Sequence, residues 1–406
     1  MDRPHDLVVY GATGFVGELT AAYLAEHAPA GVRIALAGRS ATKLEAVRAR
    51  LPAAARDWPL IVADSADTAA LERLAESTRV LVTTVGPYAR YGLPVVEACA
   101  RAGTHYADLT GEVLFHRDAI DRVDKIAQDT GARIVHSCGY DSIPSDLGVL
   151  VLHERAVADQ AGELTDVGLI AMAKGGFSGG TIDSMRAQFE AIGADPSRRR
   201  VVGDPHALSP DRAAEPAPAQ PADAPAPARR GSRNTWTAPF VMASYNTRVV
   251  RRSNALQDWA YGRSMRYGET MGLGSGPMGA VAAYGVTAGL GAVVAGFGAA
   301  PTRAVLDRVL PKPGAGPSAA ARAAGWFRMD IEATTTGGRR YRARVSGTGD
   351  PGYAATAVML GESGLCLAVD ELPDRAGSLT PATAMGSVLV RRLVAAGHTY
   401  TVTDLR

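Results

Sequence analysis

The sequence predicts an α/β fold, in which a doubly wound parallel sheet is followed by a second α+β domain with an antiparallel or mixed sheet. Three observations support this prediction. An apolar run at residues 7–10 leads through a glycine turn into a helical pattern that reaches about residue 26. Strand-like and helical segments then alternate as far as residue 137, which is typical of a parallel sheet with helices on both faces. After about residue 146 the alternation stops and a hairpin pattern follows.

The length and composition are those of a two-domain globular protein. The chain has 406 residues, of which 47% are hydrophobic and 21% are charged, and its formal net charge is +2. A net charge this small creates no field that would favour nucleic acid. The cysteines Cys99, Cys138 and Cys366 are far apart and lack metal-ligand spacing, so we expect no metal site and no disulfide framework. We also expect no signal peptide, and a cytoplasmic location.

The first turn has the spacing of a dinucleotide-binding fingerprint. Its glycines form a G-x-x-G-x-x-G pattern between a strand and a helix. Gly11 allows a sharp turn, Gly14 lets the backbone approach a pyrophosphate, and Gly17 lets the helix lie close to the strand. The helix N-terminus adds free N–H groups and a partial positive charge. The residues expected to contact the cofactor phosphates are Gly11, Ala12, Thr13, Gly14, Phe15, Val16 and Gly17. A glycine turn in some other α/β fold is the alternative.

The end of the second strand indicates which dinucleotide binds. An NAD site usually has an acidic residue about 20 residues past the fingerprint, which binds the ribose 2′-hydroxyl. This chain has Arg39 and Ser40 there instead, with Lys43 one turn later. A guanidinium can bind a 2′-phosphate with two hydrogen bonds, whereas a carboxylate would repel it. The sequence therefore favours NADP(H) over NAD(H); the alternative is a solvated, basic start of a helix.

The other elements of this domain place further candidates for the cofactor site. Asp64, after the third strand, can accept a hydrogen bond from the adenine amino group. Thr84, Val85 and Gly86, after the fourth strand, should pass near the middle of the cofactor, because ligands bind outside the carboxyl ends of such strands. Strands are expected at residues 32–37, 60–63, 80–85, 105–109 and 133–137, and helices at 41–50, 71–75, 94–102 and 114–129.

The nicotinamide should lie beside the ends of the fourth and sixth strands. Tyr88 follows the fourth strand, and Tyr140 and Asp141 follow the sixth. A tyrosine hydroxyl can donate a proton or a hydrogen bond, and Asp141 could orient it, so these residues are the catalytic candidates. For each of them a structural role is the alternative: the tyrosines would pack against the cofactor, and Asp141 would serve a turn or a helix cap.

The second half of the chain contains two irregular segments. A glycine-rich loop at residues 174–181 opens a helix at 182–192, and it either approaches a ligand with its backbone or is a flexible connection. Residues 204–233 are rich in Pro and Ala. We expect this segment to be an extended surface insertion that forms no packed core and carries no chemistry.

Residues 271–302 contain no charged side chain. This length meets the criterion for a transmembrane helix, although the many Gly and Ala residues make insertion marginal. Three interpretations stay open: a membrane span, a surface element that touches a membrane or an apolar substrate, and a buried helix.

The remaining segments complete the second domain. A helix is expected at residues 147–153, a strand at 166–173, strands within 236–250, and a helix after residue 254. Apolar and charged residues alternate through 327–345 around Gly337 and Gly338, which predicts an antiparallel hairpin with one buried face. Helices at 354–372 and 382–396 and a last strand at 398–402 follow.

Several segments resemble the saccharopine dehydrogenase-like oxidoreductase family, and the resemblance covers nearly the whole chain. It is carried by residues 9–17, 37–40, 84–88, 106–112, 139–146 and 178–181. Residues 246–254 and 380–386 further resemble the mycobacterial-type trans-acting enoyl reductases within that family.

The resemblance implies a domain organisation and a reaction. It implies a Rossmann NADP-binding domain at residues 1–140, an α+β substrate or association domain at 141–380, and a helix and strand at 381–406 that return to the Rossmann domain. The implied reaction is NADPH-dependent reduction of an α,β-unsaturated acyl thioester in polyketide-type lipid assembly, as for phthiocerol and phenolphthiocerol. The thioester would be carried on an acyl carrier domain of a polyketide synthase that lacks its own enoyl reductase.

Two other functions stay open. One is oxidation or reduction of a C–N bond, as in saccharopine dehydrogenase; this needs a cationic pocket for an amino-dicarboxylate, and only Arg248, Arg251 and Arg252 offer themselves. The other is a non-catalytic NADP(H)-binding protein at membranes. Peripheral membrane contact and a homodimer are compatible with the sequence.

Overall fold

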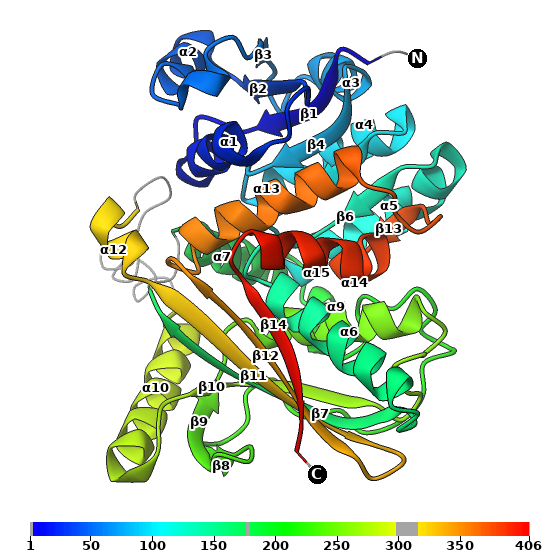
Figure 1. Ribbon diagram of the computed structural model, residues 1–406, viewed down its shortest axis with the longest axis vertical. Coiled ribbons are helices and arrows are strands. Elements are labelled where there is room, and N and C mark those ends of the chain that lie inside the picture. The colour runs from blue at the N-terminus through cyan, green and yellow to red at the C-terminus, as the bar shows by residue number, and fades with distance from the viewer. Residues whose placement is uncertain (1–2, 176–178, 298–315, 406) are drawn as a thin grey trace.

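The computed structural model describes residues 3–175, 179–297 and 316–405, and it contains two seven-stranded sheets (Figure 1). The first sheet has the order β13-β6-β5-β4-β1-β2-β3, and all its strand pairs are parallel. This arrangement confirms the predicted doubly wound, Rossmann-type sheet. Its strands are β1 (His5–Tyr10), β2 (Ile34–Gly38), β3 (Leu60–Val62), β4 (Thr78–Thr83), β5 (His105–Ala107), β6 (Arg133–Val135) and β13 (Gly377–Leu379).

Helices cover both faces of this sheet, because the residues of β1 are apolar on both sides. Leu7, Val8 and Val9 are fully buried. Leu7 and Val9 belong to the core beneath α1 and α13, and Val8 belongs to the core beneath α3, α4 and α5. The helices are α1 (Phe15–His27), α2 (Ala41–Arg48), α3 (Thr68–Glu76), α4 (Tyr88–Ala102), α5 (Val113–Thr130) and α13 (Ala354–Val369), with a 3₁₀ turn η1 (Ala53–Ala55).

The Rossmann sheet includes two elements from the C-terminal part of the chain. β13 pairs with β6, and α13 packs beside α1 (Figure 1). Gly364 of α13 permits close packing, since a Cβ atom there would lie 2.6 Å from Leu7 Cδ1. The polypeptide therefore returns to the first sheet at residues 354–379, before residues 399–404 add the last strand of the second sheet.

The second sheet is mixed, as predicted, with the order β14-β12-β11-β7-β10-β9-β8. Only its β7–β10 pair is parallel among the pairs that the structure describes. The predicted hairpin is confirmed as β11 and β12, whose Met329 and Ile331 face the buried side. The strands are β7 (Leu164–Lys174), β8 (Ala228–Arg230), β9 (Thr235–Pro239), β10 (Arg266–Gly272), β11 (Trp326–Thr335), β12 (Arg340–Thr348) and β14 (Thr399–Asp404).

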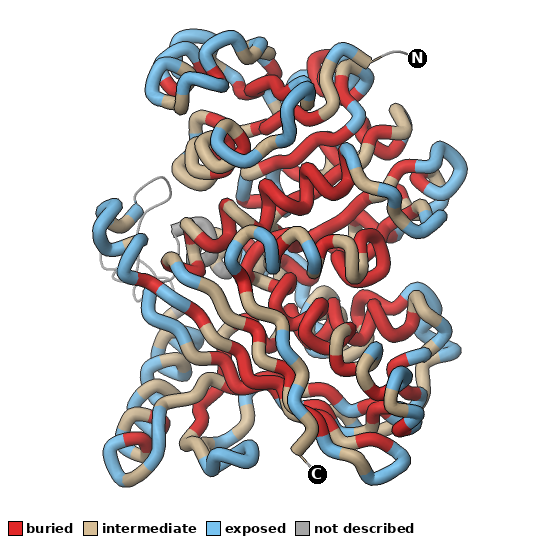
Figure 2. The backbone as a smooth tube through the Cα atoms, viewed as in Figure 1, coloured by how far each residue is buried: buried red, intermediate tan, exposed pale blue. Residues whose placement is uncertain are grey.

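Two helices lie between the second sheet and the first domain. α6 (Ile143–Ala158) packs on β11 and β12, and α9 (Ala243–Ala255) packs on α6 and β10. Figure 2 shows buried backbone running through these helices and both sheets. The other helices of this part are α7 (Gly179–Ala194), α8 (Arg198–Gly203), α10 (Gly276–Phe297), α12 (Ala319–Ala323), α14 (Pro381–Ala384) and α15 (Gly386–Ala395).

Two expected elements differ from the structure. The strands expected within residues 236–250 are β9 followed by the first half of α9, and the end of α9 is followed by turns and β10 where a helix was expected. Thr247, Val249 and Val250 are β-branched and favour strands, but burial of the whole of α9 against both domains outweighs this preference. The last strand, β14, pairs with β12 of the second sheet and does not return to the Rossmann sheet.

The Pro- and Ala-rich insertion is packed more tightly than its composition suggests. Ala207 and Leu208 are fully buried and share a small core with Tyr245 and Val249. The expectation that residues 204–233 contribute nothing to a packed core is therefore wrong. Composition alone misled here, because the residues that hold the insertion lie on α9.

Three buried arginines of α9 fix the path of this insertion. Arg248 binds the carboxylate of Asp223 at 2.6 Å and the carbonyl oxygen of Val202 at 3.0 Å. Arg251 donates to the carbonyl oxygen of Pro205 at 3.0 Å and to Gln220 Oε1 at 3.1 Å, and Arg252 donates to the carbonyl oxygens of Leu208 and Ser378. The three guanidinium groups that the sequence suggested for binding a substrate carboxylate are therefore already hydrogen-bonded within the protein.

Residues Gly276–Phe297 of the uncharged segment form the long helix α10, which is exposed. Among the described residues it is the helix that is long and apolar enough to cross a membrane, but only 11% of its most apolar window is buried. The buried-helix interpretation is therefore wrong. The helix packs against β9 along one side (Figure 1).

Candidate functional site

The glycine turn has the geometry of a phosphate-binding turn. Gly11 has φ = +87°, in the region that favours glycine, and a Cβ on Gly17 would lie 2.2 Å from the carbonyl oxygen of Gly11. Thr84 Oγ1 donates to the same oxygen at 3.1 Å and ties the end of β4 to the turn. No side chain caps the N-terminus of α1, so its first N–H groups can bind phosphate oxygens.

The residues after β2 have the groups that a 2′-phosphate needs. Arg39 is exposed, and no described residue accepts a hydrogen bond from its guanidinium. Ser40 is the N-cap of α2 and accepts from the backbone N–H of Lys43 at 3.4 Å. Asp64 uses Oδ1 to accept from the backbone N–H of Ala66 at 2.9 Å, a local turn contact, and keeps its other carboxylate oxygen exposed. The guanidinium of Arg39, after β2, is therefore available to bind a 2′-phosphate.

Tyr88 connects two loops at the end of the first sheet. Its hydroxyl donates to the carbonyl oxygen of Thr83 at 3.1 Å and accepts from the backbone N–H of Leu109 at 3.1 Å. The side chain is only 5% exposed, and burial raises its pKa well above the usual value. The geometry gives Tyr88 a positioning role, since its proton is already bound. Val85 and Gly86, on the same loop, are partly or fully exposed along the edge where the cofactor is expected.

Glu112 organises the same edge; it follows the fifth strand in the sequence, and no cofactor or catalytic role was predicted for it. Its carboxylate accepts from the backbone N–H groups of Tyr88 and Ala89, at 3.0 and 2.7 Å, and from Ser184 Oγ at 2.7 Å. It therefore caps the N-terminus of α4 and joins it to α7 of the second domain. Burial raises the pKa of this carboxyl. Its place directly after the fifth strand, in a Thr-Gly-Glu sequence, was the available signal.

A buried polar network lies behind the ends of β5 and β6. Asp108 is fully buried and accepts four hydrogen bonds: from Tyr106 and His136 side chains, and from the backbone N–H groups of Thr110 and Ser137. The rings of His136 and His116 lie 4.3 Å apart, and His116 Nδ1 is 2.9 Å from the hydroxyl of Tyr245. Because these residues are far apart in the sequence, no local pattern predicted this network.

Tyr245 and Ser137 carry this network across the domain boundary. Ser137 adopts φ = +64°, and its hydroxyl donates to the carbonyl oxygen of Thr110 at 2.8 Å while it contacts the hydroxyl of Tyr245. Because Tyr245 belongs to α9, the second domain helps to fix the loops that follow β5 and β6.

Tyr140 and Asp141 lie beside this network, and of the two only Asp141 is not buried. Asp141 is partly exposed, and burial, with a smaller contribution from the charge of Asp108, raises the pKa of its carboxyl to about 7. Tyr140 is 9% exposed; its ring packs edge-on against Phe327, and its backbone N–H donates to Thr356 Oγ1 at 3.0 Å. No described residue binds the Tyr140 hydroxyl. A carboxyl that titrates near neutral pH beside a free phenol can supply a proton.

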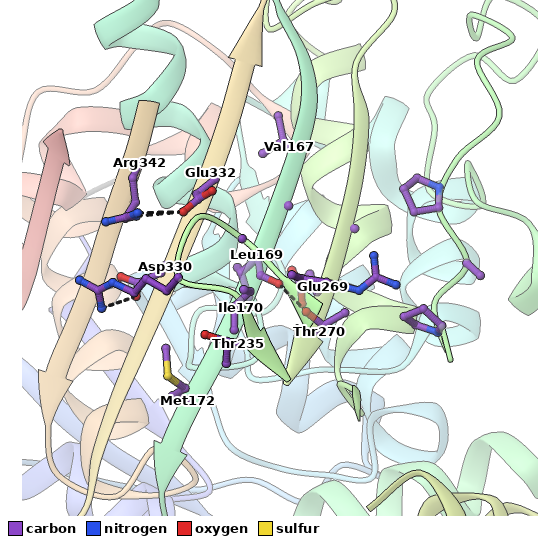
Figure 3. Close-up of a pocket in the computed structure, with 18 residues that line it drawn as sticks. Val167, Leu169, Ile170, Met172, Thr235, Glu269, Thr270, Asp330, Glu332 and Arg342 are labelled. Carbon is purple, nitrogen blue, oxygen red and sulfur yellow. Dashed lines mark hydrogen bonds and ion pairs between the residues drawn. The ribbon is translucent and has the colours of Figure 1, made fainter. Parts of the chain in front are cut away.

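A separate cavity of about 550 Å³ lies on the outer face of the second sheet, where the insertion covers it (Figure 3). Ion pairs between Arg342 and Glu332 and between Arg233 and Asp330 cross its wall. None of the cofactor or catalytic candidates lines it. The lining residues include Ile170, Met172, Pro221, Pro225, Arg230 and Thr270. The glycine-rich loop of the sequence analysis falls partly on residues 176–178, outside the described residues.

The Rossmann sheet, the open glycine turn and the free Arg39 define an NADP-dependent oxidoreductase. The model of the saccharopine dehydrogenase NADP-binding domain matches residues 7–135 and confirms NADP(H) as the cofactor. The chain belongs to the saccharopine dehydrogenase-like oxidoreductase family. The residues that would hold NADP(H) are those of the glycine turn, with Arg39 and Ser40 at the 2′-phosphate.

Curated relatives span the chain from end to end. A Mycobacterium ulcerans protein named trans-acting enoyl reductase is 48% identical over 420 residues, which cover 99% of each chain. A Mycobacterium bovis protein of the same name is 49% identical over 416 residues, covering 100% of this chain and 99% of that one. A Mycobacterium tuberculosis protein, provisionally given that name, is 52% identical over 415 residues, covering 99% of this chain and 98% of that one.

Solved structures show the same fold at low identity. The saccharopine dehydrogenase (L-Glu forming) of Saccharomyces cerevisiae matches with a TM-score of 0.58 and 12% identity, covering 98% of this chain and 99% of that one. The homospermidine synthase of Legionella pneumophila, solved with NAD, matches with a TM-score of 0.54 and 10% identity, covering 98% and 91%. At this identity the similarity concerns the fold alone.

Proposed function

We propose that this protein is a trans-acting enoyl reductase, which reduces an α,β-unsaturated acyl thioester with NADPH. The thioester is carried on the acyl carrier domain of a polyketide synthase, in lipid assembly of the phthiocerol and phenolphthiocerol type. The names of relatives at about half identity over the whole chain support the reaction class. The observation in the structure that carries the proposal is the Asp141 carboxyl, whose pKa is raised to about 7 at the end of β6.

Each candidate has a distinct role in this reaction. Bound NADPH supplies the hydride that reaches the β-carbon. The Tyr140 hydroxyl donates a hydrogen bond to the thioester oxygen as negative charge develops there. Asp141 in its acid form delivers a proton to the α-carbon, and its near-neutral pKa lets it hold that proton at physiological pH. Tyr88 and Glu112 hold the loops around these groups in place.

The C–N oxidoreductase alternative lacks a site for its substrate among the described residues. An amino-dicarboxylate needs free cationic groups, but Arg248, Arg251 and Arg252 are buried and bind the insertion. Burial lowers the pKa of Arg251 and of Arg252 to about 10. Their guanidinium groups therefore already lie away from solvent.

The decisive experiment measures oxidation of NADPH by the purified protein with two substrates. One is a crotonyl thioester of pantetheine or of an acyl carrier domain, and the other is a mixture of a keto acid and an amino acid that forms an imine. Oxidation with the thioester alone is expected, and it should be lost in Asp141→Asn while NADPH affinity stays unchanged. Oxidation with the imine alone would replace this proposal with C–N chemistry. NADPH binding without any turnover would identify a non-catalytic binding protein.

A further inference from the structure

Helix α10 exposes an apolar surface along its whole length. It has 22 residues and is about 33 Å long at the usual rise of 1.5 Å per residue. Four large apolar side chains point into solvent: Met278 is 78% exposed, Val281 67%, Tyr284 60% and Val294 55%. Isolated exposed apolar residues are common, but Met278, Val281 and Tyr284 follow one another at three-residue spacing on one uncharged helix, which indicates a partner.

The opposite side of α10 is attached to the protein. Gly279 and Ala283 are buried on the side that packs against β9. Thr287 donates its hydroxyl hydrogen to the carbonyl oxygen of Ala283 at 2.8 Å, so it presents no free polar group. A helix that crossed a bilayer would have to detach from β9. The attached arrangement instead suits a helix that lies in the plane of a surface.

One unpaired cation and two aromatic rings border the exposed face. The guanidinium of Arg229 lies 5.4 Å from the ring centroid of Trp236, and that ring lies 6.4 Å from the ring of Tyr284. Arg229 is exposed and forms no ion pair with a described carboxylate, whereas its neighbour Arg230 lines the cavity on the other side of β8. Tyrosine, tryptophan and arginine beside an apolar face are typical of the headgroup level of a bilayer.

We propose that α10 lies in the interface of a bilayer that contains anionic phospholipid, with Arg229 on a headgroup phosphate. This attachment is independent of the enoyl reductase proposal. Gly285 and Gly289 would also suit packing against a second copy of the helix, because a Cβ on either would meet nothing within 4 Å. The unpaired Arg229 favours lipid over a copy of the same surface, which would bring like charges together.

Vesicle sedimentation tests the proposal with the full-length protein and two lipid mixtures. Binding to vesicles of phosphatidylcholine with phosphatidylglycerol is expected, and binding to phosphatidylcholine alone should be much weaker. Val281→Asp should weaken binding by about tenfold or more, because it puts a charge into the apolar face. Val157→Asp is the matched control, since Val157 is 60% exposed on α6 and should not matter. Equal loss in both variants would overturn the proposal.

Arg229 and the rival partner are tested separately. Arg229→Gln should weaken binding roughly fivefold at low salt, and Arg56→Gln, an exposed arginine in the loop before β3, should change nothing. Light scattering on the same samples reports mass. A dimer that Val281→Asp converts to monomer, or absence of binding to the anionic vesicles, would overturn the proposal. NADPH affinity should stay unchanged throughout, which separates this surface from the cofactor site.

Discussion

His136 donates from Nδ1 to the carboxylate of Asp108 at 2.8 Å, and both side chains are fully buried. The same carboxylate fixes the backbone of Thr110 and Ser137, so one residue holds the loops after β5 and β6 together. The accessible Asp141 lies three residues beyond Cys138, on the second of these loops. The shape of the candidate active site therefore depends on a group that is itself fully buried.

Replacing Asp108 by Asn should destabilise the protein strongly. The amide cannot accept all four hydrogen bonds, and buried donors would be left without a partner. We expect a loss of about 3 kcal/mol in the free energy of unfolding, measured by urea denaturation. Asp6→Asn is the control: Asp6 pairs with the exposed Arg33, and its loss should cost less than about 1 kcal/mol. Similar effects of the two changes would contradict the assigned role of Asp108.

Arg39→Ala should reduce the affinity for NADPH but not for NADH. Losing the hydrogen bonds to a charged phosphate should cost about 1.5–3 kcal/mol, which corresponds to roughly 10- to 150-fold in affinity. Calorimetric titration with each cofactor measures this difference, and Arg56→Ala serves as the control. An equal loss for both cofactors would show that Arg39 does not bind the 2′-phosphate.

Gly17→Ala should disturb the turn between β1 and α1. The new Cβ would lie 2.2 Å from the carbonyl oxygen of Gly11 and 2.9 Å from Thr84 Oγ1, so the helix must shift. We expect a loss of about 1–3 kcal/mol in stability, together with weaker NADPH binding. Gly193→Ala on α7 is the control, because a Cβ there meets nothing within 4 Å and Ala favours a helix. Unchanged cofactor affinity in Gly17→Ala would argue against phosphate binding at this turn.

The pH dependence of turnover should report Asp141. If its acid form donates the proton, kcat should fall as the pH rises through about 7, the pKa of this carboxyl. Asp141→Asn should lower kcat by about 10²–10⁴-fold and remove this inflection. Single-turnover kinetics with saturating NADPH measure both effects. An unchanged profile in the variant would assign the proton to another group, with Tyr140 the next to test.

Glu269 should make stability depend on pH in an unusual direction. Burial raises the pKa of this carboxyl from 4.5 to about 7. Between these values the folded protein holds a proton that the unfolded chain has lost, so this group makes the free energy of unfolding fall as the pH rises. Glu269→Gln should remove this fall, which makes the variant relatively more stable at pH 8 than at pH 5 by up to about 3 kcal/mol.

Asp6 provides the opposite control for that measurement. Its hydrogen bond with Arg33 lowers the pKa of its carboxyl, so its contribution to stability is present at neutral pH and is lost as the pH falls below about 4. Asp6→Asn should therefore change the acid limb of the stability profile and leave the limb from pH 5 to 8 unaltered. A change in the upper limb of both variants would mean that Glu269 is not the group that titrates there.

The sequence predicted well those structural features that depend on residues close together in the chain. The turn at Gly11 to Gly17 and the alternating hairpin of β11 and β12 are local patterns, and both are confirmed. The contacts that build the site are not local. Asp108 and Tyr245 meet only because α9 packs behind the ends of β5 and β6, and no spacing rule relates them. The strand prediction for α9 failed for the same reason. Its β-branched residues favour strands, but the contacts that bury it as a helix come from both domains and leave no local pattern.

The arginines of α9 recognise the insertion chiefly through its main chain. Val202, Pro205 and Leu208 contribute only their carbonyl oxygens, which every amino acid has, whereas Gln220 and Asp223 contribute side chains. The residues at the first three positions can therefore be exchanged with little effect on these hydrogen bonds. A change in the number of residues between 202 and 208 would instead move all following acceptors out of register. This part of the chain should tolerate substitutions but not insertions or deletions, in contrast to an ordinary linker.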